Sequence, residues 1–252
     1  MIKILVIGNS FSQDATYYLH DMAAADHIDL KAVNLYIGGC NLQRHWNNIV
    51  NDTADYLYEE NGKSTEKFVS VRQALDSDEW NYIVTQQASY DSGLIETYYP
   101  FVENIFNYIR KEAPKAEFML QETWAYETDS NHDCFDRYEK SQKLMYEKLS
   151  KAYRSAADRL GVRLIPCGDI IQKLRGIEPF DYETGGMSLC RDGFHMNFIY
   201  GRYLLSAVWY KYLTGNSVFD NSFMPRTELA PNAECDEKIL SIIKRVVDKV
   251  VH

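Results

Sequence analysis

Cysteine is scarce in this sequence, and long apolar runs are missing. The 252 residues include five cysteines, an odd number with no C-x-x-C pair: Cys40, Cys134, Cys167, Cys190 and Cys235. Scattered cysteines exclude a disulfide-stapled scaffold and offer no metal-ligand spacing, so we expect free thiols and no bound metal. No apolar run approaches the roughly 20 residues that cross a bilayer, so we expect no membrane span.

The apolar run at the N-terminus, Ile2 to Ile7, is too short for a secretion signal. It stops at Gly8 and no small-residue cleavage site follows, which favours a buried strand over a signal peptide. Together with free thiols, this predicts a cytoplasmic protein, or an exported one if a leader was trimmed from the chain.

Basic residues are outnumbered by acidic ones. The 27 Lys and Arg against 36 Asp and Glu give a net charge of -9, and no basic stripe offsets it, so nucleic acid is excluded as a partner. A Gly-rich phosphate loop and a dinucleotide fingerprint are also missing, and we expect no cofactor. The chain is 46% apolar and has no linker or repeat, which predicts one globular domain over residues 1–252.

Short apolar runs alternate with helical patterns along the chain. We expect strands at Ile2–Ile7, within Leu30–Ile37, and at Tyr82–Thr85, Ala116–Leu120 and Val162–Ile165. We expect helices over 14–25, from Gly39 through Trp46 to Tyr56, over 101–109, over 135–160 with Gly161 as C-cap, over 198–213 and over 239–250. Strands separated by helices predict an α/β fold, a three-layer α/β/α sandwich around a mainly parallel five-stranded sheet. Ligands bind such sheets at the carboxyl ends of the strands.

Ser10 follows the first predicted strand in the segment Gly8-Asn9-Ser10-Phe11-Ser12. A serine at a strand-to-helix turn exposes its hydroxyl above the sheet, beside unpaired N–H groups that stabilise negative charge. Those are the needs of a nucleophile that attacks a carbonyl carbon. The alternative is that Ser10 or Ser12 is only a helix N-cap.

His195 is the histidine best placed to act as a base. It follows Arg191-Asp192-Gly193-Phe194 in a polar loop, and Asp192 is close enough in sequence to reach the imidazole across the glycine turn. Such a contact fixes the imidazole tautomer and stabilises the imidazolium. The alternative is a surface Asp-Gly turn with a histidine that packs locally.

Gly8-Asn9-Ser10 near one end and Asp192-Gly193-Phe194-His195 near the other resemble the SGNH (GDSL-like) hydrolase family. The string Ile7 to Ser12 together with Gln86-Gln87-Ala88-Ser89 resembles an uncharacterised bacterial branch of it. The resemblance implies a flavodoxin-like fold and a serine hydrolase with Ser10 as nucleophile, His195 as base and Asp192 as its orienting acid.

The resemblance also implies an oxyanion hole with donors from the loops after the second and third strands, to which we assign the N–H of Ser10, the N–H of Gly39 and a third, side-chain donor. The alternative for Gly39 is a helix-start turn that simply needs glycine. Where the family shows Gly-x-Asn-Asp, this chain has Gln86-Gln87-Ala88-Ser89, and we favour Gln87 over Gln86 as the third donor. Asn9 also departs from the family's aspartate.

The substrate is less constrained. Asn9, Gln86, His45 and Trp124 follow predicted strands and are candidates for a substrate pocket, with burial in the core as the equal alternative for Trp124. Among partners, we expect a small-molecule or glycan ester, first of all an acetyl ester of a carbohydrate. A lipid or thioester hydrolase, or a non-catalytic carbohydrate-binding domain, are the alternatives. Cys40 and Cys190 are disfavoured as nucleophiles because no base accompanies them. The sequence gives no indication of oligomeric state.

Overall fold

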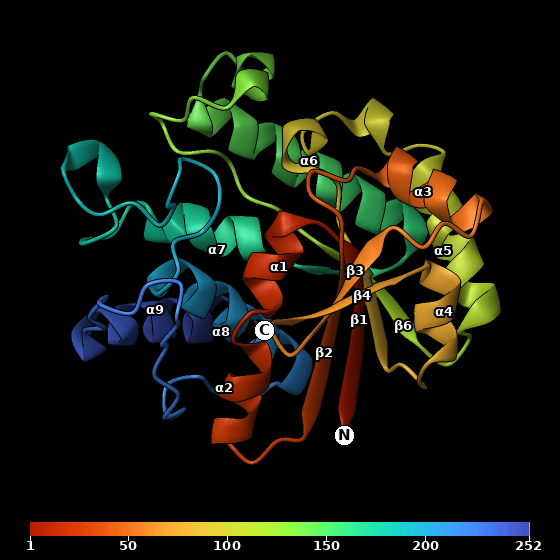
Figure 1. The fold of residues 1–252 in the computed structure, drawn as a ribbon. Helices are drawn as coiled ribbons and strands as arrows, with labels where there is room; N and C mark the ends of the chain where they lie inside the picture. The colour runs from red at the N-terminus through yellow and green to blue at the C-terminus, as the bar shows by residue number, and fades with distance from the viewer. Residues whose placement is uncertain (252) are drawn as a thin grey trace.

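The computed structural model describes residues 1–251 and has the expected α/β architecture, a sheet with helices on both faces (Figure 1). Within those residues the sheet has seven strands in the order β4-β3-β2-β1-β5-β6-β7. The strands are β1 (Ile2–Gly8), β2 (Leu30–Tyr36), β3 (Tyr56–Glu60), β4 (Lys63–Val69), β5 (Tyr82–Thr85), β6 (Glu117–Gln121) and β7 (Arg163–Ile165). The helices are α1 (Ser10–Thr16), α2 (Leu19–Ala25), α3 (Leu42–Val50), α4 (Val71–Asp76), α5 (Phe101–Glu112), α6 (Gln142–Leu160), α7 (Cys167–Leu174), α8 (Tyr200–Thr214) and α9 (Glu237–Val250).

The five strands expected from the sequence form the parallel part of the sheet. β1 lies between β2 and β5 and pairs with both in parallel, and β6 and β7 continue on the far side of β5. The middle of β1 is fully buried because helices cover both of its faces, which is why it reads as a continuous apolar run. The predicted fold class is confirmed.

The predicted number of strands is wrong. β3 and β4 form a hairpin that adds two strands antiparallel to β2 and to each other. Tyr56, which we expected on a helix, begins β3, and the preceding helix α3 ends at Val50. The hairpin turn is Asn61-Gly62, and both residues have positive φ (51° and 77°). Asn-Gly is the preferred pair for a two-residue turn of this kind, so this signal was present in the sequence.

The helices also differ in detail from the prediction. The helix expected over 14–25 is two helices, and α1 starts at Ser10 because Asn9 caps it. The helix expected over 135–160 is a short 3₁₀ segment followed by α6, and Gly161 ends α6 with φ 65°, as predicted. Helices α4 and α7 were not expected.

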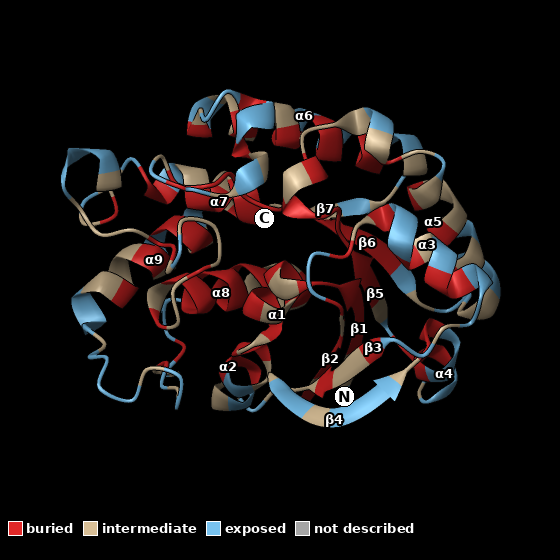
Figure 2. Cartoon of the chain, turned by 45° about the horizontal axis from the view of Figure 1, so that its top comes forward, coloured by how far each residue is buried: buried red, intermediate tan, exposed pale blue. Residues whose placement is uncertain are grey.

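Helices cover both faces of the sheet. Helices α1, α2, α8 and α9 pack together on one face, and α3, α4, α5 and α6 lie on the other (Figure 1). Helix α8 is buried on almost every side, whereas β4 at the sheet edge is largely exposed (Figure 2). In the part of the chain that the structure describes, no helix is both long and apolar enough to span a membrane.

Candidate active site

Ser10 is the first residue of α1 and lies just beyond the carboxyl end of the central strand β1. Asn9 is the N-cap: its Oδ1 accepts a hydrogen bond from the N–H of Phe11 at 3.0 Å. Ser12 is buried and its hydroxyl is 2.7 Å from Asn34 Oδ1, while the N–H of Asn9 donates to the same hydroxyl. The capping role that the sequence left open for Ser10 or Ser12 therefore belongs to Asn9, and the half-exposed hydroxyl of Ser10 remains available.

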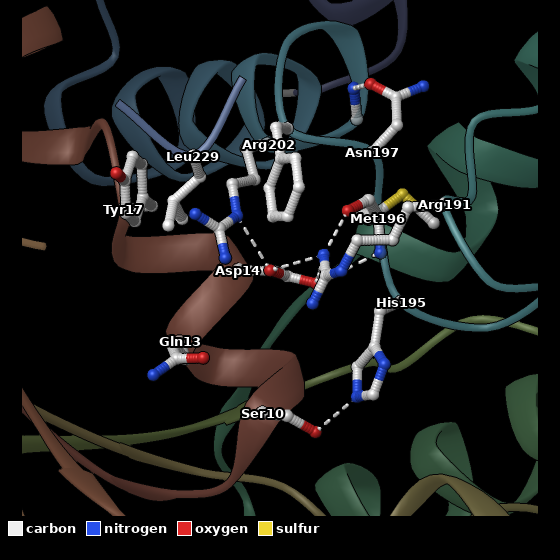
Figure 3. A network of polar contacts seen from close by, with 12 residues as sticks. Ser10, Gln13, Asp14, Tyr17, Arg191, His195, Met196, Asn197, Arg202 and Leu229 are labelled. Atoms are coloured by element: carbon white, nitrogen blue, oxygen red, sulfur yellow. Dashed lines mark hydrogen bonds and ion pairs between the residues drawn. The ribbon is translucent and has the colours of Figure 1, made fainter. Parts of the chain in front are cut away.

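The imidazole of His195 lies against that hydroxyl. Nε2 of His195 is 2.9 Å from Ser10 Oγ, although 185 positions separate the two residues (Figure 3). On the other side of the ring, Nδ1 is 2.7 Å from Asp192 Oδ2. Oδ1 of Asp192 accepts the backbone N–H groups of His195 at 2.8 Å and Phe194 at 3.2 Å. Ser10, His195 and Asp192 thus form a continuous chain of hydrogen bonds, with the imidazole in the middle.

The charge of Asp192 suits this arrangement. Partial burial alone would raise the pKa of Asp192. The hydrogen bonds from His195 and Phe194 have the larger, opposite effect, so the pKa is lowered overall. Asp192 is therefore a carboxylate at neutral pH, and it holds the proton of the neutral imidazole on Nδ1. Nε2 is then free to accept a proton from the Ser10 hydroxyl.

Asp14, one helical turn after Ser10, holds the loop that carries His195. It is fully buried, and its carboxylate accepts the N–H of Met196 at 3.0 Å, Arg191 Nη1 at 3.0 Å and Arg202 Nε at 2.8 Å (Figure 3). Ser10 and an anchor of the loop that carries His195 therefore share one short helix. Sequence reasoning missed this network. Its only signal was the spacing of four between Ser10 and Asp14, which places them on neighbouring turns of a helix.

A second anchor ties the same loop to the segment after β6. The indole N–H of Trp124 donates to Phe194 O at 2.7 Å, and Glu127 N donates to Gly193 O at 2.7 Å. Trp124 is fully buried and stacks on Phe11 with ring centroids 4.2 Å apart. Trp124 thus supports the loop that carries His195 from within the core, and of the two roles left open for it, pocket wall or core, it has the core role.

The Gly38-Gly39 turn lies next to Asn9. Asn9 Nδ2 donates to Cys40 O at 3.0 Å, which ties the turn to the start of α1. Gly39 is exposed, has φ 61°, and would meet nothing if it carried a Cβ, so its left-handed backbone is what calls for glycine. Within residues 1–251 the N–H groups of Gly39 and Ser10 donate to no other group, so both are available as hydrogen-bond donors.

Gln87 does not offer a free donor. Both hydrogens of its amide are used by Thr97, with Nε2 3.1 Å from Thr97 O and 3.0 Å from Thr97 Oγ1. Its Oε1 accepts the N–H of Leu42 at 2.9 Å and so holds the first turn of α3. The buried Gln86 is the glutamine directed toward Asn9, with Nε2 3.2 Å from Asn9 Oδ1. The side-chain geometry therefore reverses our preference for Gln87, because strand alternation no longer applies after β5 ends at Thr85.

His45, the remaining pocket candidate, is fully buried. Its Nδ1 lies 2.9 Å from Tyr56 Oη and 3.4 Å from Cys40 Sγ, and burial lowers its pKa to about 3, so the ring is neutral and structural. Burial raises the pKa of Cys40 and of Cys190 to about 12 each, so both are inert thiols at neutral pH.

Comparisons with known proteins agree with this fold. Residues 3–238 match a family model described as a domain of unknown function (DUF4886). A DUF4886 family protein of known structure from Bacteroides uniformis shares 34% sequence identity, with a TM-score of 0.89 over 99% of this chain and 94% of that chain. A comparison with curated proteins gives no match.

More distant structures share the architecture. A proposed SGNH hydrolase from Slackia heliotrinireducens has 19% identity and a TM-score of 0.56, covering 84% of this chain and 98% of that chain. An acetyl xylan esterase has 15% identity and a TM-score of 0.56, covering 82% of this chain and 98% of that chain. The fold that the SGNH resemblance implied is confirmed.

Proposed function

The chain is a member of the DUF4886 family, and from the contact between Ser10 and His195 we propose that it is a serine hydrolase of small carboxylic esters. The observation that carries the proposal is the Ser10–His195–Asp192 chain, in which a half-exposed hydroxyl meets an imidazole held by an ionised carboxylate. A domain that only binds its ligand has no need of a base oriented in this way. The shared architecture with esterases is consistent with the proposal.

The reaction divides into two halves. Ser10 Oγ attacks the acyl carbon while His195 Nε2 accepts its proton, and Asp192 stabilises the resulting imidazolium. The negative charge on the carbonyl oxygen is met by the N–H groups of Ser10 and Gly39. When the tetrahedral intermediate collapses, His195 gives the proton to the departing alcohol and leaves an acyl-Ser10 ester. Water then attacks this ester, His195 takes the water's proton, and the acid and the Ser10 hydroxyl are released.

The substrate we propose first is an acetyl ester of a carbohydrate. The partly exposed side chains that follow Ser10 along α1, Gln13 and Tyr17, are polar, which suits a hydroxyl-rich alcohol better than a long acyl chain. The alternative substrate is a lipid or thioester. If it is the true substrate, hydrolysis rates should rise with the length of the acyl chain.

Hydrolysis of p-nitrophenyl acetate by wild type and by Ser10→Ala tests the activity. We expect the rate to fall by about 10⁴-fold or more in Ser10→Ala. Ser155→Ala, at an exposed position on α6, is the matched control and should match wild type. Equal rates in wild type and Ser10→Ala would show that Ser10 is no nucleophile and would leave a non-catalytic binding domain as the function.

The acyl and alcohol parts are tested with two substrate series. Acetate release from acetylated xylo-oligosaccharides is compared with hydrolysis of p-nitrophenyl esters of two to sixteen carbons. Fast acetate release with a preference for short acyl chains supports the carbohydrate ester, whereas a preference for long chains would favour the lipid alternative.

A further inference from the structure

A cavity of about 710 Å³ lies beside α1, outside the Ser10–His195–Asp192 chain. Its walls come from three places: the segment from α1 into α2 with Gln13, Tyr17 and Asp21, the tip of the β3–β4 hairpin over residues 59–64, and the loop over residues 226–229. Arg202 of α8 closes it on one side. Its size lies within the range of about 300–1,000 Å³ that is usual for small-molecule sites.

The cavity begins one helical turn from the nucleophile. Ser10, Gln13 and Tyr17 are the half-exposed residues of α1 and its C-cap, and the positions between them are buried. Their spacing of three and four places them along one face. With a rise of 1.5 Å per residue, Gln13 lies about 4.5 Å and Tyr17 about 10 Å further along the helix axis than Ser10. Figure 3 shows this progression from Ser10 past Gln13 to Tyr17, with Arg202 and Leu229 beside it.

Tyr36, at the end of β2, lies beside the Gly38-Gly39 turn. A Cβ built on Gly38 would lie 3.2 Å from the Tyr36 hydroxyl. The path from Ser10 to the cavity runs along α1, where Gln13 lines the cavity and its side-chain amide donates a hydrogen bond to Glu59.

The lining mixes hydrogen-bond donors, acceptors and aromatic surface. Arg202 is 97% buried, its guanidinium lies 4.0 Å from the Tyr17 ring, and its Nη1 has no hydrogen-bond partner in residues 1–251. Glu59 is also buried and accepts hydrogen bonds from the amides of Gln13 and Asn34; burial raises its pKa despite these bonds. Buried polar groups of this kind fix the orientation of a ligand that reaches them.

The charges of the lining balance. Lys63, Arg202 and Arg226 face Asp21, Glu59 and Glu228, so the formal charges cancel and no ion of either sign is selected. A neutral ligand with many hydroxyl groups satisfies both donors and acceptors, and its apolar ring face suits the Tyr17 ring.

We propose that this cavity is the subsite for the alcohol part of the ester, and that this part is a neutral sugar residue; the assignment of its role rests on the proposed hydrolase function. The acyl group then lies at Ser10 and the Gly38-Gly39 turn, and the sugar extends along α1 past Gln13 to the cavity. The cavity binds the sugar in the absence of the acyl group as well.

Ser64→Trp tests the subsite because it places a bulky indole at an exposed lining position on β4, away from Ser10 and His195. The matched control is Ser155→Trp on α6. For acetylated xylo-oligosaccharide we expect Ser64→Trp to lower kcat/KM by about tenfold or more, mainly through KM, and to leave p-nitrophenyl acetate within about twofold. Arg226→Ala, with Arg245→Ala on α9 as its control, should show a smaller loss of the same kind.

These experiments distinguish a wrong assignment of the subsite from a wrong assignment of hydrolase activity. If wild type cleaves both esters and Ser64→Trp changes neither, the subsite is wrong and the hydrolase stands. If wild type cleaves no ester, the hydrolase is wrong, and binding decides the subsite. For this arm, deacetylated xylo-oligosaccharide is titrated into Ser10→Ala by calorimetry. Binding that is lost in Ser10→Ala/Ser64→Trp supports the subsite, and no binding to Ser10→Ala refutes it.

Discussion

Replacing Asp14 with asparagine should reduce both stability and turnover of the proposed hydrolase, although Asp14 does not touch the imidazole of His195. The substitution keeps the shape of the side chain but puts an amide N–H₂ where a carboxylate oxygen accepts hydrogen bonds. Both oxygens are used, one by Arg202 Nε and the other by the N–H of Met196, and Arg191 approaches both. Whichever way the amide turns, a donor faces a donor in a fully buried place.

The expected size of the effect follows from burial. Breaking a buried ion pair from one side costs about 3–5 kcal/mol, and for a chain of this size each kcal/mol lowers Tm by about 2–4 °C, so we expect a drop of about 6–20 °C. Arg202 carries most of this, since its side chain is 3% exposed, whereas that of Arg191 is 22% exposed and is partly compensated by water. The loop also loses its tie at Met196, and a displacement of about 1 Å at His195 lowers kcat by about 10²-fold.

Thermal unfolding and the kinetics of p-nitrophenyl acetate hydrolysis measure these effects. Because Asp14 positions the loop and leaves the Asp192–His195 contact in place, kcat should fall while the pH at which activity is half-lost stays unchanged. Asp136→Asn is the control, since that carboxylate is 73% exposed and pairs only with Lys140 on the surface. An Asp14→Asn protein with the Tm and kcat of wild type would refute the reasoning.

Two further predictions concern protonation. The lowered pKa of Asp192 keeps it ionised from pH 5 to 8, so Asp192→Asn, which removes this charge beside His195, should lower kcat by about 10⁴-fold throughout that range. An Asp192→Asn protein with the kcat of wild type would show that the carboxylate has no part in the reaction. Burial raises the pKa of Glu122 to about 8, and the neighbouring Asp169 carboxylate adds to the shift. The folded chain therefore keeps a proton that the unfolded chain loses above about pH 4.3, and stability falls as pH rises between these values. Glu122→Gln should flatten the decrease in Tm from pH 5 to pH 8, and an equally steep decrease in the variant would contradict this origin.

Much of the fold could be predicted because a buried strand is a short run of apolar residues in the sequence. The five parallel strands lie between helices, so each is an apolar run. β4 was missed because it is largely exposed and mostly polar, and β3 was missed because only two of its five positions are buried, so neither forms an apolar run. The Asn61-Gly62 turn was the local clue, and it required reading the turn before the strands.

In the candidate site, too, residues with characteristic neighbours in the sequence could be predicted, and residues that depend on distant partners could not. Ser10 and the pair Asp192 and His195 stand at turns with characteristic neighbours, and the structure brings these residues together. The partners of Asp14 lie 177 and 188 positions away, so no local pattern announces them. The role of Gln87 could not be predicted from the sequence, because a polar residue at a strand end can bind a ligand or the backbone. Only the positions of Thr97 and Leu42 in the fold decide between the two.

The outermost strands have a consequence for how separate molecules meet. β4 carries Lys63 and Lys67, has Glu66 at φ 60°, and its partner β3 shifts register between Tyr58 and Glu59. At the opposite border β7 spans three residues and Pro166 follows it. Charge, an irregular backbone and brevity each hinder a strand from a second copy from joining the ladder. Both borders of the sheet therefore carry features that oppose edge-to-edge aggregation.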